Sequence, residues 1–193
     1  MAEAVGADPL DFGDAWAAAV DDRWTGGLEP SLRLICRSLG LDPTPSAVSR
    51  AIAHRVEFHL SVFLPRPDAS AALRALREAS YRLGLISDCS SEVPGLWSGG
   101  ELAPLFDAAI FSCSVGIRKP DPRIYRMACD RLMVEPRECL YIGDGASDEL
   151  AGATAIGMTA VKLGTGAASV PWTGRSIASL SDVAGLVSSL EGS

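Results

Sequence analysis

The sequence lacks the paired cysteine motifs that are typical of disulfide-rich and zinc-binding proteins. Its cysteines are odd in number and scattered, with no C-x-x-C motif, and they are Cys36, Cys89, Cys113, Cys129 and Cys139. This pattern argues against both a disulfide framework and a zinc site. Most of them lie in apolar stretches, as reduced core thiols of cytosolic proteins do. The cysteine pattern therefore predicts a cytoplasmic protein.

Long apolar runs and an excess of positive charge are also absent. No apolar run approaches the ~18 residues of a membrane helix, and the first residues show no basic segment followed by an apolar one, as a signal peptide would. With 17 Lys and Arg against 24 Asp and Glu, the formal net charge is -7. An acidic chain repels phosphate backbones. We therefore expect neither a membrane nor a nucleic acid as a partner.

The sequence does contain enough apolar side chain for a folded core. Apolar residues make up 48% of the 193 residues and charged residues 21%, a composition that excludes a disordered chain. The length suits one domain, or one domain with a small insert or cap.

Residues 1–66 are predicted to form a helical unit. Asp8-Pro9 and Thr44-Pro45 each place a capping side chain before a proline at the first helical position. We expect helices from Asp8 to about Asp22, over 30–39, and from Thr44 to Phe63. The last has an apolar stripe with helical spacing, which consists of Val48, Ile52, Val56, Leu60 and Phe63. Pro65-Arg66-Pro67 indicates a hinge to a second unit.

Residues 67–193 alternate between helix and strand patterns. Short apolar strands are predicted over 82–87, 108–113, 139–143 and 158–163, with helices capped by Asp68 and Asp121, over 145–156 and over 181–190. Residues 164–176 form a loop rich in glycine and serine. Alternation of this kind predicts βαβ units and a parallel sheet. In such sheets, ligands bind outside the carboxyl ends of the strands.

Two polar groups near these strand ends are candidates for binding an anion. Ser87 closes the first strand and is followed by Asp88; a hydroxyl there, ahead of a helix, suits a phosphoryl group, although an ordinary helix cap would use the same residues. Lys119 is followed by a proline and a helix cap, which favours a positioned cation over a solvated surface lysine.

A third group is acidic. Asp144 follows the 139–143 strand, and Asp148 and Glu149 come within one turn of it. Clustered carboxylates repel one another unless a cation pairs them, and hard oxygen ligands of this kind suit Mg²⁺. The alternative is a helix N-terminus at which the dipole favours acids.

Together these residues resemble the haloacid dehalogenase (HAD) superfamily, in particular its phosphatase-like branch with a small helical cap. The family's second, third and fourth motifs match Ser87, Lys119-Pro120, and Asp144 with Glu149 as the second acid. The resemblance covers about residues 8 to 163. It implies an α/β, HAD-like (Rossmannoid) fold with helices on both faces of a parallel sheet. Residues 1–66 would be the cap and residues 67–193 the core domain.

The sequence departs from the family at its first motif, Asp-x-Asp-x-Thr, in which the first Asp is the nucleophile and the second the general acid/base. Only Asp8, Asp11 and Asp14 lie early, and the few residues before them are too short for a core strand. Asp88 also replaces the Asn usual in this branch. We therefore expect the core to lack its central strand. One explanation is that Met1 is an internal methionine of a longer protein.

A missing central strand would leave the 82–87 and 139–143 strands without ladder partners, and unpaired edges recruit other chains. We expect either a homodimer or direct pairing of these two strands.

The resemblance implies a Mg²⁺-dependent phosphohydrolase that acts on a small phosphorylated metabolite through an aspartyl phosphate. Ser87, Asp88 and Lys119 would bind the phosphoryl group, with Ser87 and Lys119 the catalytic residues present. Asp144, Asp148 and Glu149 would hold the metal. Without its nucleophile, the chain is predicted to be inactive. A 2-haloacid dehalogenase of the same fold, which needs no metal, and a silent module that binds phosphate or a protein are the alternatives.

Two histidines and two tryptophans of the cap remain. His54 and His59 lie five residues apart, not on one helix face, and show no acid partner, so we interpret them as packing or surface residues. Trp16 and Trp24 are interpreted as core residues, with pocket lining the alternative for Trp24.

Overall fold

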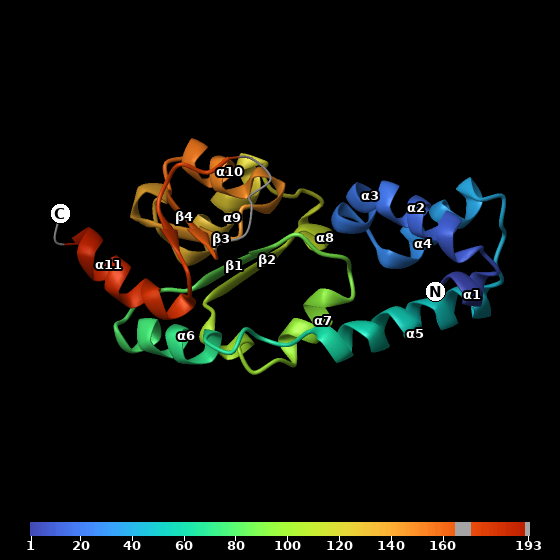
Figure 1. The fold of residues 1–193 in the computed structure, drawn as a ribbon, viewed down its shortest axis with the longest axis horizontal. Helices are drawn as coiled ribbons and strands as arrows, with labels where there is room; N and C mark the ends of the chain where they lie inside the picture. The colour runs from blue at the N-terminus through green and yellow to red at the C-terminus, as the bar shows by residue number, and fades with distance from the viewer. Residues whose placement is uncertain (165–170, 192–193) are drawn as a thin grey trace. The chain divides into compact units, whose positions relative to one another are not determined.

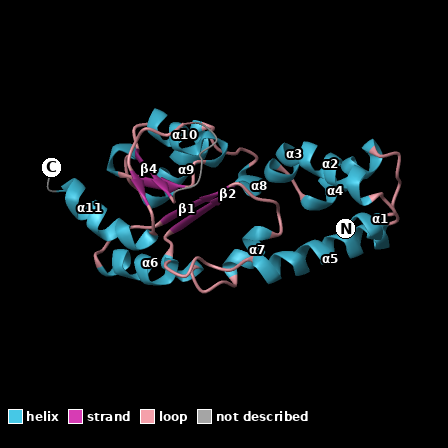
Figure 2. Ribbon diagram, in the orientation of Figure 1, coloured by secondary structure: helices cyan, strands magenta, loops and turns pink. Residues whose placement is uncertain are grey.

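A computed structural model describes residues 1–164 and 171–191, and the chain divides into two compact units. Unit 1 comprises Met1–Leu64, Asp88–Gly100 and Phe111–Gly116, and unit 2 comprises Pro65–Ser87, Glu101–Ile110 and Ile117–Ser193. Figure 2 shows that unit 1 is built of helices, whereas the strand arrows belong to unit 2. Each unit is described by itself.

Unit 1 contains short and long helices. They are α1 (Ala2–Val5), α2 (Pro9–Ala18), α3 (Val20–Thr25), α4 (Leu28–Ser38), α5 (Pro45–Val62), α7 (Val93–Ser98) and α8 (Ser112–Val115). Helices α2 and α5 start at the predicted caps. The Asp8 carboxylate accepts from the Leu10 N–H at 2.9 Å. The Thr44 hydroxyl oxygen accepts from the Ala47 N–H at 3.3 Å. Both predicted caps are confirmed.

The single helix predicted from Asp8 to about Asp22 is wrong. Helix α2 ends at Ala18, because Ala19 takes φ -87° and ψ 25°, and α3 then continues to Thr25. The break places Arg23 in the second of these helices, where its side chain is buried.

The apolar stripe of α5 is buried over its first half only. Val48 is 1% exposed, whereas Leu60 is 61% exposed. Helices α1 and α4 pack against α5, and Figure 1 shows α1 at the start of α5. The core of this unit takes side chains from α1, α2, α4 and α5, and its buried members are Val5, Phe12, Leu32, Ile35, Cys36, Val48 and Ala51.

Unit 2 alternates strands and helices, as predicted. Its strands are β1 (Gly84–Ser87), β2 (Ala108–Phe111, its last residue in unit 1), β3 (Leu140–Gly143), β4 (Thr159–Leu163) and β5 (Ser176–Ile177). Its α-helices are α6 (Ala69–Glu78), α9 (Pro122–Leu132), α10 (Glu149–Ala155) and α11 (Val183–Glu191). Its 3₁₀ turns are η1 (Ala103–Leu105), η2 (Pro136–Glu138), η3 (Ala146–Asp148) and η4 (Leu180–Asp182).

The described strands form two sheets. One has the order β1-β2 and the other the order β3-β4-β5. The pairs β3–β4 and β4–β5 are parallel, with Ile142 opposite Val161 and Leu163 opposite Ile177, so the predicted parallel pairing is confirmed. Among the described strands, β1 is not a neighbour of β3, and the direct pairing expected for these two strands is not found. Strand β5 was not predicted.

Asp68 stands before α6, as predicted, but its side chain does not cap that helix. Its Oδ2 accepts from the Ser179 hydroxyl and from the Leu180 N–H, both at 2.8 Å. These bonds lower the pKa of Asp68 to about 2. The carboxylate thus ties the start of α6 to the turn before α11, and these two helices pack together, as Figure 1 shows.

Further differences from the sequence-based expectation lie after β3 and β4. The helix predicted from residue 145 begins only at Glu149, because Ser147 and Asp148 take left-handed φ angles of 52° and 55°. Of the predicted loop over 164–176, residues 165–170 lie outside the described residues. No helix in the described part of the chain is long and apolar enough to cross a membrane.

Candidate active site

Lys119 and Glu149 form a buried ion pair in unit 2. Lys119 stands just before α9, and Glu149 is the first residue of α10. The Lys119 Nζ lies 2.5 Å from the Glu149 Oε2, and the two side chains are 13% and 4% exposed. The fold therefore pairs Lys119, which was predicted to bind phosphate, with Glu149, which was predicted to bind a metal.

Glu149 is held by further donors. The Tyr141 hydroxyl donates to Oε2 at 2.8 Å, and the Gly145 N–H donates to Oε1 at 3.1 Å. The Tyr125 hydroxyl donates to the Glu149 backbone carbonyl at 2.8 Å. Both carboxylate oxygens therefore already accept from donors of the protein, and a hydrogen-bonded carboxylate of this kind fixes the direction of its lysine partner.

Glycines make room for this arrangement. A Cβ at Gly143 would overlap the Glu149 carboxylate. A Cβ at Gly152 would lie 2.9 Å from both the Cβ and the carbonyl oxygen of Pro120 and 2.7 Å from the Tyr125 hydroxyl. Helix α10 can therefore approach the proline after Lys119 only because residue 152 has no side chain.

Asp144 and Asp148 differ from the Lys119–Glu149 pair because both are exposed. The Asp144 Oδ1 accepts from the Ala146 N–H at 2.9 Å, which forms a turn directly after β3. Gly145 continues the turn with φ 87°, a left-handed value that glycine adopts without strain.

The acids after β3 do not by themselves form a metal centre. Within residues 1–164 and 171–191, no three side chains of His, Cys, Asp or Glu come close enough together to hold an ion. Glu149, predicted as a ligand, has Lys119 on one oxygen and Gly145 N–H on the other. Magnesium prefers carboxylates with free lone pairs and keeps near-ideal octahedral geometry. In this arrangement the predicted three-acid set does not fit Mg²⁺.

Ser87 and Asp88 stand where β1 ends. Ser87 is the last residue of β1 in unit 2, and Asp88 begins the next segment of unit 1. The following loop is fixed within unit 1, since the Cys89 N–H donates to the hydroxyl of buried Ser112 at 3.0 Å. The predicted phosphate-binding residues are thus distributed over both units.

The sequence-based reasoning missed several polar residues. Tyr125 and Tyr141, whose rings meet edge to face at 5.4 Å between centroids, were not singled out. Tyr141 did carry a signal, because it shares a strand face with Gly143 and a buried phenol needs a hydrogen-bond partner. His59 was thought to have no acid partner, but its Nδ1 lies 3.1 Å from the Glu92 Oε1. His54 is exposed, and its Nδ1 lies 3.8 Å from the Glu57 Oε2, so the expectation of no acid partner is wrong for both histidines.

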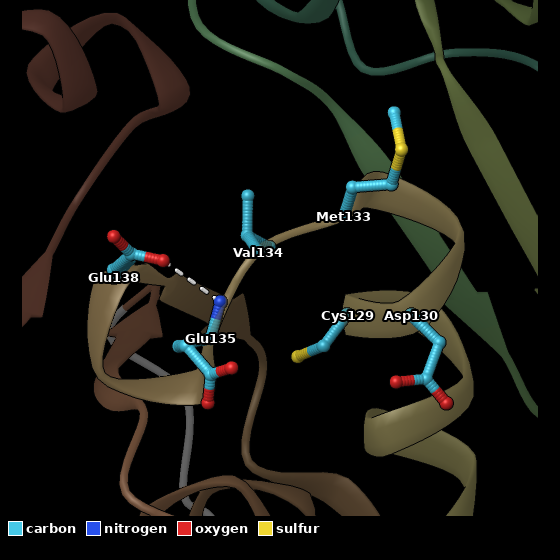
Figure 3. Close-up of a pocket in the computed structure, with 6 residues that line it drawn as sticks. All are labelled: Cys129, Asp130, Met133, Val134, Glu135 and Glu138. Carbon is cyan, nitrogen blue, oxygen red and sulfur yellow. Dashed lines mark hydrogen bonds between the residues drawn. The ribbon is translucent and has the colours of Figure 1, made fainter.

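A cavity of about 310 Å³ opens elsewhere in unit 2, at the end of α9 (Figure 3). Its lining consists of Cys129, Asp130, Met133, Val134, Glu135 and Glu138. The Glu138 carboxylate accepts from the Glu135 N–H at 2.8 Å, as the dashed line in Figure 3 marks. Three acids in the lining would repel an anion, so this cavity does not suit a phosphorylated substrate.

The comparison with known proteins identifies the family. The profile of the haloacid dehalogenase-like hydrolases matches residues 38–155, more than half of the chain. The chain belongs to this family. It is therefore a HAD-like hydrolase by descent, as the motifs at Ser87, Lys119 and Asp144 indicated.

Relatives of two kinds match the chain. It is 31% identical over 138 residues to a glyceraldehyde 3-phosphate phosphatase of Methanopyrus kandleri, covering 69% of this chain and 58% of that protein. It is 37% identical over 98 residues to an (S)-2-haloacid dehalogenase of a Pseudomonas species, covering 50% of this chain and 43% of that protein. The chain spans about half the length of these curated relatives.

A solved structure supports the fold. The crystal structure of a 2-haloacid dehalogenase from Pseudomonas syringae superposes with a TM-score of 0.70 at 22% identity, covering 98% of this chain and 85% of that one. This likeness shows that the fold is the α/β HAD fold predicted from the sequence.

Proposed function

We propose that this HAD-like hydrolase carries the binding residues of a phosphohydrolase for a small phosphorylated metabolite, and that residues 1–193, which contain no Asp-x-Asp-x-Thr motif, do not turn such a substrate over by themselves. The observation that carries the proposal is the buried Lys119, one of two lysines in the chain, whose ammonium is held by Glu149. The phosphatase from Methanopyrus kandleri, which aligns over 138 residues, supports the same reaction class. We also infer a cytoplasmic location.

We further propose that the chain forms a homodimer through exposed strand edges. Light scattering across a dilution series tests this.

The family's reaction would use the two aspartates of the Asp-x-Asp-x-Thr motif: the first attacks phosphorus as the bond from phosphorus to the leaving alcohol oxygen breaks, and the second gives that oxygen its proton. Water then hydrolyses the acyl phosphate and releases inorganic phosphate. The Lys119 ammonium and the Ser87 hydroxyl would bind the phosphoryl oxygens, and Asp88, which follows Ser87 in the chain, is the third residue proposed to bind the phosphoryl group. An Asp-x-Asp-x-Thr motif has no match in residues 1–193, so these residues would supply binding and electrostatics but no nucleophile.

The magnesium requirement implied by the family remains a prediction for this chain. Asp144 and Asp148 offer exposed carboxylates, but Glu149 is already paired with Lys119. We expect weak Mg²⁺ binding in a calorimetric titration, and micromolar affinity would contradict this expectation.

A 2-haloacid dehalogenase is the second candidate function. It is favoured by the 37% identity to the Pseudomonas enzyme, although that match covers only 98 residues. In this reaction, the carboxylate would displace a halide from carbon, and water would then hydrolyse the ester. The phosphatase is favoured by the longer alignment, which spans 138 residues with the Methanopyrus phosphatase against 98 with the dehalogenase.

The proposal is tested by measuring turnover and binding separately. The chain is incubated with p-nitrophenyl phosphate and Mg²⁺, and in parallel with 2-chloropropionate. We expect no turnover of either, because the nucleophile is absent. Phosphate release that Asp144→Asn abolishes would show that the chain is active after all, and halide release would favour the dehalogenase.

Binding is measured with inorganic phosphate. We expect Lys119→Gln to weaken phosphate binding at least tenfold, since a charge-assisted hydrogen bond is lost. Lys162→Gln, which changes the other lysine, serves as the matched control and should bind as the unchanged chain does. Equal binding by Lys119→Gln would contradict the role of Lys119. Circular dichroism shows whether each variant folds.

A further inference from the structure

A group of buried polar side chains in unit 1 has no role in the proposed reaction. Arg23 of α3 is 6% exposed, and its guanidinium lies over the Trp16 ring, 4.3 Å from the ring centroid. The Arg23 Nε is buried and has no hydrogen-bond partner among the described residues. Aromatic rings stabilise a guanidinium through its face, but they do not satisfy its N–H donors.

A second arginine makes a cation–π contact with the same tryptophan. Arg55 of α5 lies 5.2 Å from the Trp16 centroid, and its Nε donates to the Glu92 Oε1 at 3.1 Å. The Ser90 hydroxyl donates to the same oxygen at 2.8 Å, and the His59 Nδ1 lies 3.1 Å from it. Oε1 of Glu92 is therefore fully used, whereas its Oε2 is buried and has no hydrogen-bond partner within the described residues.

The charges in this cluster do not balance. Two guanidiniums lie near one carboxylate, but only Arg55 is its ion-pair partner, while Arg23 interacts with Glu92 at longer range, which leaves one positive charge. Burial and the nearby Arg55 lower the pKa of Arg23, and the same two causes lower the pKa of His59. Both directions agree with a buried cluster in which the charged forms of Arg23 and His59 are destabilised, first by burial and then by Arg55. An incompletely paired buried cation costs stability, so a site that keeps one is a candidate for a ligand that completes the pairing.

We propose that Arg23, Arg55 and Glu92 form a binding site for a small oxyanion that carries a hydroxyl group beside its charge. The anionic oxygens would accept from Arg23 Nε and balance the two guanidiniums, whose planar forks suit carboxylate and phosphate. The ligand hydroxyl would donate to the Glu92 Oε2. Protonated phosphate and 2-hydroxycarboxylates have both features. This site lies within unit 1 and does not involve Lys119.

The segment that carries Glu92 is held in place within the same unit. The Leu28 N–H at the start of α4 donates to the Ser91 hydroxyl oxygen at 2.9 Å. Ser90 and Glu92, on either side, are thereby fixed relative to α4. The site is therefore built by side chains that are already ordered, which lowers the entropic cost of binding.

The test uses proton–nitrogen NMR of the full chain, observing the Nε–H signals of the arginines and the indole N–H of Trp16. Glycolate and acetate, which differ by one hydroxyl, are titrated at constant ionic strength, with inorganic phosphate and chloride in parallel. We expect saturable shifts of the Arg23 and Trp16 signals with glycolate and phosphate, about tenfold weaker binding of acetate, and no saturable shift with chloride.

Arg23→Gln should abolish the Trp16 response. Arg33→Gln is the matched control, because Arg33 is a partly exposed arginine of α4 paired with Glu29, and it should leave the response unchanged. An Arg23 Nε–H already bonded to Glu92 in the free chain, or identical responses to glycolate and chloride, would overturn the proposal. Should Arg23→Gln not fold, the titration of the unchanged chain still decides. Lys119→Gln should not alter the Trp16 response, which separates this site from the proposed phosphate site.

Discussion

Replacement of Glu149 by glutamine is the sharpest test of how the candidate active site is held. The carboxylate is 4% exposed, with Lys119 and Tyr141 on one oxygen and the Gly145 N–H on the other. Glutamine has nearly the same shape but carries no charge, and one of its two terminal atoms donates instead of accepting. Wherever the amide nitrogen lies, it meets a donor.

The size of the effect follows from two losses. Removal of one partner from a buried ion pair costs about 3–5 kcal/mol, and the partial exposure of Lys119 places this case at the lower end. A buried donor left without an acceptor costs about 1–3 kcal/mol. We therefore expect Glu149→Gln to lower the free energy of unfolding by about 4–6 kcal/mol, or the Tm by roughly 8–24 °C for a chain of this length.

The assay is urea unfolding followed by circular dichroism, with thermal unfolding in parallel. Glu29→Gln is the control, since it removes an exposed pair with Arg33 four residues away on α4 and should cost only about 0.3–0.5 kcal/mol. A change within about 0.5 kcal/mol for Glu149→Gln would refute the reasoning, because it would match an exposed pair.

Two further predictions concern close packing and acid stability. Gly152→Ala should destabilise the chain by about 1–2 kcal/mol in urea unfolding, because its Cβ would approach Pro120 and Tyr125 to within 3 Å and overpacking outweighs the gain in helix propensity. Gly185→Ala on α11, where an added Cβ would meet no neighbouring atom within 4 Å, should stabilise the chain by about 0.5–1 kcal/mol. Equal changes in unfolding free energy for the two glycine variants would contradict this prediction. Asp68, with its pKa lowered to about 2, contributes stability that is present above its unfolded pKa of about 4 and is lost as the pH falls to about 2. Asp68→Asn should therefore lose less stability than the unchanged chain over this pH range, and parallel curves would argue against the Ser179 contact.

Much of the fold could be predicted from local patterns. The caps at Asp8 and Thr44 act within three residues, so the sequence shows them directly. The strands after residue 82 and the helices between them followed from apolar periodicity. The break at Ala19 carried no proline or glycine signal, and the exposed C-terminal end of the α5 stripe could not be foreseen, because burial depends on what packs there.

The sequence marked Lys119 and Glu149 as candidate site residues, but it did not predict that they form a pair. Ser87, Lys119 and Asp144 follow from motifs at strand ends, whereas the role of Glu149 depends on which donors reach it. Lys119 is 30 residues away, and no local pattern relates the two. The same carboxylate could hold a cation or a lysine, and the donors that the fold places around it decide between them.

What the sequence by itself determined is the order of the elements, their caps and the family motifs, because each depends on the chemistry of neighbouring residues. Only the tertiary structure decided which charged groups share a site: Glu92 meets Arg55 across 37 residues, and Asp68 meets Ser179 across 111. The physical reason is that Coulomb and hydrogen-bond energies depend on distance and desolvation. Both are set by the path of the backbone through space and not by separation along the chain.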